Sequence, residues 1–115
     1  MRKTALEVYE VIKAFSDPST EEKYLKLGFV PDGLALKLTA GKVSVYAVEH
    51  PWKGAAITLQ SFTPRTMTQY EVSCPTKCSR EQIAGLIYMN VAQNFRDSAE
   101  AFKAHFQQLG VPLFQ

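Results

Sequence analysis

The middle of the chain, residues 34–74, constrains the fold most, because its apolar side chains recur at every second position. The segment LALKLT alternates leucine with alanine, lysine and threonine, and KVSVYAVEH keeps the same period. AAITLQSFT and MTQYEVSC repeat the pattern after breaks that contain proline. A period of two places alternate side chains on opposite faces of a sheet. The pattern therefore predicts four antiparallel strands over residues 34–39, 42–50, 55–63 and 67–74.

These strands are expected to pair in sequence order as a meander. The turns are taken to be Ala40-Gly41 and Pro64-Arg65. In both hairpins the resulting register then places apolar side chains opposite apolar side chains, as cross-strand packing requires. The expected pairs are Leu38 with Val43, Leu36 with Val45, Leu59 with Tyr70, and Ile57 with Val72.

Helix signals precede the strands. A capping box of the form Thr-x-x-Glu, followed by apolar residues at helical spacing, predicts a helix over residues 4–15. Asp17 then stands where a helix cap is favoured, and Pro18 suits a first helical turn. These signals predict a second, short helix over residues 18–27.

A last helix is predicted over residues 79–109, from the cap at Ser79 and a long apolar stripe. Unbroken, it would be ~46 Å long at ~1.5 Å per residue, whereas the strands span only ~28 Å. Phe102 and Phe106 on the overhanging end would then need cover. A break near residues 90–94, the two N-terminal helices, or a second subunit would each supply it.

The element order predicts an α+β fold, with two N-terminal helices, a four-stranded antiparallel meander and a long C-terminal helix packed on one sheet face. Residues 1–115 are expected to form a single domain, since 46% are hydrophobic and 21% charged, the usual globular balance. The net charge of +2 argues against a dedicated duplex-DNA binder. No apolar run approaches the ~20 residues that cross a bilayer, so we expect a cytoplasmic protein without a membrane partner.

The outer face of the predicted sheet mixes polar residues with large apolar ones. Phe62 and Met67 lie opposite each other in the expected register, and Tyr46 shares their face. The loop EHPWKG adds an exposed tryptophan between proline and glycine, a residue type that often dominates interfaces. Capping of the core edge is the equally simple interpretation of this tryptophan. The predicted binding residues are Tyr46, Trp52, Lys53, Phe62, Met67, Phe102 and Phe106.

Both cysteines stand in SCPTKCS, where the last strand is expected to meet the last helix. Three zinc ligands could come from Cys74, Cys78 and His50, at irregular spacing. On an unbroken helix, His105 would lie ~39 Å from the start of the helix and could not join them. A helix N-terminus beside Lys77 favours a thiolate, but no histidine lies near in sequence to act as its base. We expect reduced, packed thiols with no metal and no cofactor; a disulfide and a reactive thiol are the alternatives.

No phosphate-binding glycine motif, nucleophile elbow or zinc-protease motif occurs in the sequence. We therefore predict a non-catalytic protein that acts through protein–protein contacts, either as a homodimer or with another protein. The first alternative is a single-stranded nucleic-acid binder that uses basic and aromatic residues of the sheet, such as Lys37 and Tyr46. Further alternatives are a small-molecule-binding domain and a thiol-dependent enzyme.

Overall fold

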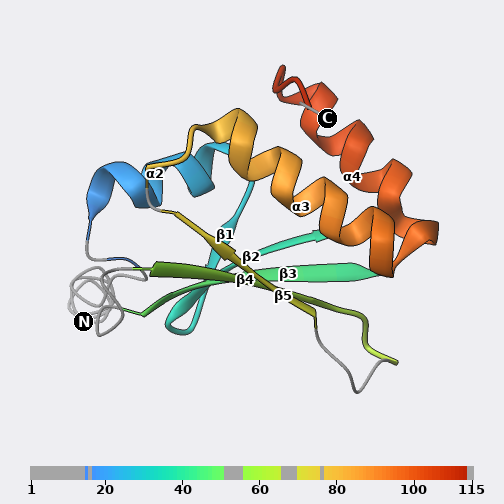
Figure 1. The fold of residues 1–115 in the computed structure, drawn as a ribbon, viewed down its shortest axis with the longest axis horizontal. Coiled ribbons are helices and arrows are strands. Elements are labelled where there is room, and N and C mark those ends of the chain that lie inside the picture. The colour runs from blue at the N-terminus through green and yellow to red at the C-terminus, as the bar shows by residue number, and fades with distance from the viewer. Residues whose placement is uncertain (1–14, 16, 51–55, 66–69, 76, 114–115) are drawn as a thin grey trace, which may run out of the picture.

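The computed structural model of the protein describes residues 15, 17–50, 56–65, 70–75 and 77–113. A five-stranded antiparallel sheet in the order β1-β2-β3-β4-β5 carries helices α3 and α4 on one face (Figure 1). This arrangement confirms the predicted α+β class, the meander and the C-terminal helical cover, while the predicted count of four strands is wrong by one. The described elements are α2 (Pro18–Lys26), β1 (Val30–Asp32), β2 (Ala35–Ala40), β3 (Val43–His50), β4 (Ala56–Phe62), β5 (Tyr70–Cys74), α3 (Arg80–Asn94) and α4 (Arg96–Gln108).

The additional strand, β1, forms one edge of the sheet and pairs with β2 from Val30↔Lys37 to Asp32↔Ala35. It has only three residues, all of them exposed, and Pro31 stands in its middle. Such a segment has no apolar alternation to reveal it, and proline argues against a central strand. Short length and proline are also two of the ways in which proteins blunt a sheet edge.

Both predicted hairpin registers place the right side chains on the right face but are displaced along the strand by two residues. Leu38 pairs with Val45 rather than Val43, because the turn consists of Gly41 and Lys42. Gly41 has φ +59, a left-handed conformation that favours glycine at this turn position. Likewise Leu59 pairs with Val72 rather than Tyr70. A shift of two preserves the alternation, so the division into inner and outer faces is predicted correctly.

Helix α2 begins and docks as the sequence indicates. The Asp17 side chain accepts a hydrogen bond from the backbone N–H of Ser19 at 3.2 Å, and Pro18 occupies the first turn. Tyr24 on this helix lies edge-on between Phe15 and Phe29, at centroid distances of 5.2 and 5.3 Å. This aromatic cluster holds α2 against the core. The helix predicted over residues 4–15 falls almost entirely outside the described residues.

The long C-terminal helix of the prediction is two helices. The chain leaves the helical conformation at Phe95, whose φ is −143° and ψ 64°, directly after Asn94. The Asn94 side-chain amide donates to the backbone carbonyl of Asn90 at 2.9 Å, the competition with backbone that makes asparagine a poor helix former. α4 then folds back beside α3, with α3 packed over β4 and β5 and α4 over β2 (Figure 1).

The return of α4 decides where the aromatic residues of the last segment lie. Phe102 and Phe106 both have 0% of their surface exposed within one chain. The alternative that a second subunit covers them is therefore wrong, and neither side chain is exposed as the predicted binding residues would have to be. A break in the helix, one of the three ways of covering them, is the one that the chain uses.

Candidate functional site

The sheet face opposite α3 and α4 is the surface on which predicted site residues come together. Tyr46 on β3 and Phe62 on β4 stack with parallel rings at a centroid distance of 5.3 Å. The Lys37 ammonium lies 5.6 Å from the centroid of the Tyr46 ring, within the range of a cation–π contact. All three side chains are half-buried. We call them the aromatic platform.

The polar groups around the aromatic platform include two hydrogen-bonded pairs. The Gln60 amide donates to the Glu71 carboxylate at 2.9 Å, and the hydroxyls of Thr39 and Ser44 lie 3.0 Å apart. Among the described outward positions of β2 to β5, only Lys37 and Glu71 are Lys, Arg, Asp or Glu. This face is therefore unusually poor in charge for a solvated sheet surface.

Three other predicted site residues lie outside the described part of the chain: Trp52, Lys53 and Met67. The role of the loop EHPWKG therefore stays a prediction. The pairing of Met67 with Phe62 followed from the expected β4–β5 register, which the structure displaces by two residues. Of the seven predicted site residues, the structure brings together Tyr46 and Phe62. It places Phe102 and Phe106 on the other side of the sheet, in the core.

The corner formed by SCPTKCS is closely packed. Cys74 is buried and Cys78 half-buried, and both are free thiols. The Tyr24 hydroxyl donates to the Cys74 sulfur at 3.2 Å, and the Lys23 ammonium donates to the Cys78 carbonyl at 2.9 Å. These contacts tie α2 to the strand–helix junction. The Cys74 side chain takes part in them, whereas Cys78 takes part through its backbone carbonyl.

Burial raises the pKa of the Cys74 thiol from its ordinary 9.0 to about 11, and the neighbouring Cys78 thiol adds to the shift. Burial likewise raises the pKa of Tyr24, so the pair is neutral at pH 8. The folded-state pKa of Cys74 lies above its ordinary value, so deprotonation favours unfolding. The contribution of the neutral Cys74 thiol to the free energy of unfolding is complete below pH 9. It is lost as the pH rises towards about 11.

We expect iodoacetamide to modify Cys74 at pH 8 at least about tenfold more slowly than an unfolded thiol, because only the thiolate reacts. Mass spectrometry of peptides after timed alkylation measures this rate. The same protein in concentrated urea is the control, in which both cysteines should react at ordinary rates. Rapid modification of Cys74 in the folded protein would contradict the role assigned to burial.

The predicted distance between His105 and the cysteines rested on an unbroken helix, and the break changes its surroundings. His105 Nε2 lies 2.7 Å from the Leu27 carbonyl, so this nitrogen donates its proton and holds α4 to the end of α2. Among the residues that the structure describes, no three of His, Cys, Asp and Glu gather closely enough to bind a metal ion.

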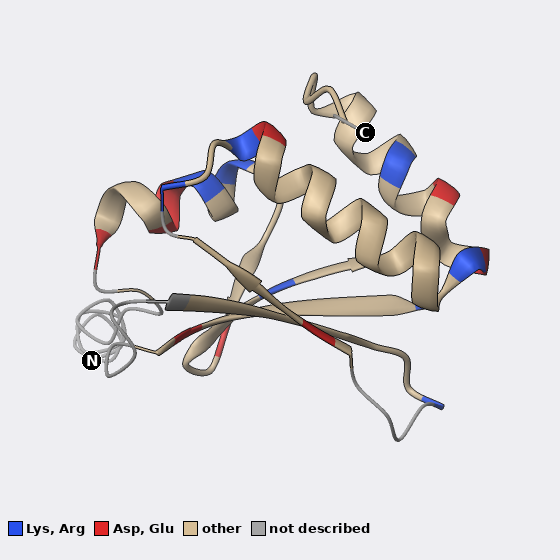
Figure 2. Cartoon of the chain, in the orientation of Figure 1, with Lys and Arg blue, Asp and Glu red and all other residues tan. Residues whose placement is uncertain are grey.

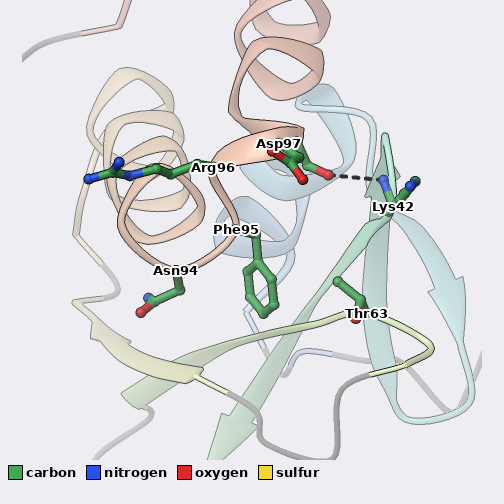
Figure 3. Close-up of a pocket in the computed structure, with 7 residues that line it drawn as sticks. Lys42, Thr63, Asn94, Phe95, Arg96 and Asp97 are labelled. Atoms are coloured by element: carbon green, nitrogen blue, oxygen red, sulfur yellow. Dashed lines mark hydrogen bonds between the residues drawn. The ribbon is translucent and has the colours of Figure 1, made fainter.

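A hollow of about 350 Å³ lies where α4 begins (Figure 3). No side chain caps this helix through a hydrogen bond, and the Ser98 hydroxyl instead accepts the backbone N–H of Lys42 at 3.1 Å. Figure 3 shows the Phe95 ring pointing towards Thr63, while Arg96 extends away from Lys42. The hollow thus lies between the β2–β3 turn and the start of α4.

A second depression, an open groove of about 380 Å³, runs between the end of β5 and α3. Cys78, Gly85, Leu86 and Met89 are among its lining residues. Further along the helix, the same side of α3 presents Tyr88 and Ala92 beside Met89. We call Leu86, Tyr88, Met89 and Ala92 the α3 flank. One signal in the sequence points to it, because Gln82 to Asn94 form thirteen consecutive residues without a charge.

No family model, curated protein or solved structure matches the chain. Within the described part of the chain, every helix is too short or too polar to span a lipid bilayer. The candidate surfaces therefore have to be judged on their own geometry.

Proposed function

We propose that the protein is a non-catalytic binding protein whose aromatic platform recognises another polypeptide. The observation that carries this proposal is the parallel stack of Tyr46 and Phe62 on the sheet face that neither α3 nor α4 covers. A flat aromatic surface flanked by hydroxyl and amide groups offers apolar area together with hydrogen-bonding partners. Aromatic residues in such settings contribute strongly to protein interfaces.

The low charge of this face favours a polypeptide over a nucleic acid. Nucleic-acid affinity comes largely from lysine and arginine side chains that neutralise phosphates. Lys37 is the lysine on the described face, and Glu71 offsets it. The proposal also places the protein in the cytoplasm, where the free thiols of Cys74 and Cys78 would stay reduced.

Single-stranded nucleic acid is the second candidate, because Lys37 over the Tyr46 ring combines a cation with a stacking surface. Oligonucleotide binding at low ionic strength that weakens steeply with salt and with Tyr46→Thr would favour it over the polypeptide.

We expect the double variant Tyr46→Thr/Phe62→Thr to lose polypeptide binding while staying folded. Threonine keeps the strand preference, and loss of one aromatic pair costs only about 0.5–1.5 kcal/mol beyond its buried area. Peptides selected from a random display library against the wild-type protein should bind the double variant at least about tenfold more weakly, as measured by calorimetry.

Leu34→Thr is the matched control, since Leu34 is an exposed apolar residue in the β1–β2 turn, away from the aromatic platform. It should bind the selected peptides as the wild type does. A library that yields no binder dependent on Tyr46 and Phe62 would count decisively against the proposed recognition surface.

A further inference from the structure

We propose that two copies of this chain associate about a two-fold axis through the outer edge of β5 and the α3 flank. The two sheets would continue into each other by antiparallel pairing of β5 with its counterpart. This inference goes beyond the proposed binding function, because it concerns a different surface from the aromatic platform.

The two edges of the sheet differ in the way that this proposal requires. β1 is blunted by its three-residue length, by Pro31 and by the charge of Asp32. β5 has five residues, Tyr70–Cys74, without an internal proline, and among the described strands only β4 pairs with it. An edge strand presents unpaired backbone N–H and C=O groups, for which another strand is the natural partner.

The helix above this edge is uncharged on its exposed side. Charges on α3 are confined to Arg80 and Glu81 at its first turn, as Figure 2 shows, whereas α4 carries both signs along its length. Met89 is 50% exposed, and Leu86 and Tyr88 are half-buried. The exposed polar residues of α3 beyond Glu81 are Gln82 and Gln93, which are uncharged. The sheet covers the side of α3 towards β4 and β5, and α4 packs against α3 as well, which leaves Met89 on the exposed side.

A second copy can meet this surface without bringing like charges together. Antiparallel pairing centred on Val72 would place Glu71 opposite Ser73 of the other copy, so the two glutamates would not meet. A two-fold axis perpendicular to the sheet keeps both helical layers on the same side. The same axis places the charged first turn of α3 in one copy beside the uncharged end of α3, near Asn94, in the other copy.

The dimensions indicate a weak dimer. α3 is about 22 Å long and β5 about 17 Å, so one axis can bring both elements into contact with their counterparts. A patch of that size corresponds to roughly 800 Å² of total buried surface, which is below the range of stable specific interfaces and in that of weak, transient ones. We therefore expect a dissociation constant on the order of 10–100 µM.

Sedimentation equilibrium of the wild-type chain over a range of concentrations tests the proposal. Met89→Lys should weaken dimerisation at least about tenfold, because it brings two like charges together near the axis. Ser73→Glu, on the exposed side of β5, should weaken it as well, because it places a like charge opposite Glu71 of the other copy, and it gives a second, independent variant. Leu25→Lys is the matched control, since Leu25 is a helical residue with 43% exposure on α2, outside the patch, and it should dimerise as the wild type does.

Hydrogen exchange distinguishes strand pairing from a contact between helices alone. Outward-facing amides of Tyr70–Cys74 should gain protection as the concentration rises from about 5 to about 500 µM. A wild-type monomer throughout that range, a loss of association in Leu25→Lys, or a dimer without β5 protection would overturn the proposal. The variants of the aromatic platform should still dimerise, so this inference and the proposed function can fail separately.

Discussion

Replacing Phe102 by alanine should lower the free energy of unfolding by about 3–5 kcal/mol, the usual cost of removing a buried aromatic ring from a core. The side chain has no exposed surface and packs with Phe106 at a centroid distance of 6.3 Å. Through these residues α4 covers the β2 side of the sheet. Deletion of the ring would leave a cavity that the helices and the sheet can close only in part by shifting towards one another.

Urea denaturation followed by circular dichroism measures this loss. Leu109→Ala, which removes an apolar side chain with 42% exposure just after α4, is the control and should cost less than about 1 kcal/mol. The loss in Phe102→Ala should be the same at every protein concentration, because a single chain buries the ring. A loss that grew with dilution would restore the interpretation that a partner covers Phe102.

Gly28→Ala should destabilise the protein by about 3 kcal/mol, the upper end of the range for a strained backbone position. Gly28 has φ +100, which side-chain-bearing residues rarely adopt. A Cβ at this position would lie 2.6 Å from His105 Nε2, the atom that bonds to the Leu27 carbonyl. The substitution therefore combines backbone strain with displacement of the contact that holds α4 to α2.

Gly33→Ala separates these two causes. Gly33 also has a positive φ, +65, but no atom lies within 4 Å of the position that its Cβ would take. It should cost only about 1 kcal/mol, the strain alone. Thermal denaturation of both variants gives the comparison. Equal losses at Gly28 and Gly33 would show that the contact with His105 contributes nothing.

The face of each strand could be predicted from sequence, whereas its exact pairing could not. Period-two alternation identifies which side chains share a face, and a displacement of two residues leaves that assignment unchanged. The displacement itself follows from Gly41. Its left-handed conformation starts the turn one residue later than expected, and a Cβ there would lie 2.9 Å from the Ser98 hydroxyl on α4. A contact with a helix more than fifty residues away is not visible in a local pattern.

Of the candidate surfaces, only the aromatic platform combines a prediction from sequence with supporting geometry. Tyr46 and Phe62 could be placed on one face from the alternation alone. The stacking of their rings depends on the observed register, which makes Tyr46 a diagonal neighbour of Phe62, across Ser44 and Gln60. The α3 flank was missed because the uncharged run from Gln82 to Asn94 does not show which side of the helix is left uncovered.

By itself, the sequence determined the α+β class, the inner and outer sides of the strands, and the caps at Asp17 and Ser79. These features depend on residues a few positions apart, whose spacing directly sets backbone conformation and side-chain direction. Only the tertiary structure decided that the chain turns at Phe95, that Phe102 and Phe106 are buried, and that α3 lies over the β5 edge. Those outcomes depend on which surfaces far apart in the sequence can be buried together, and burial is a property of the whole packed chain.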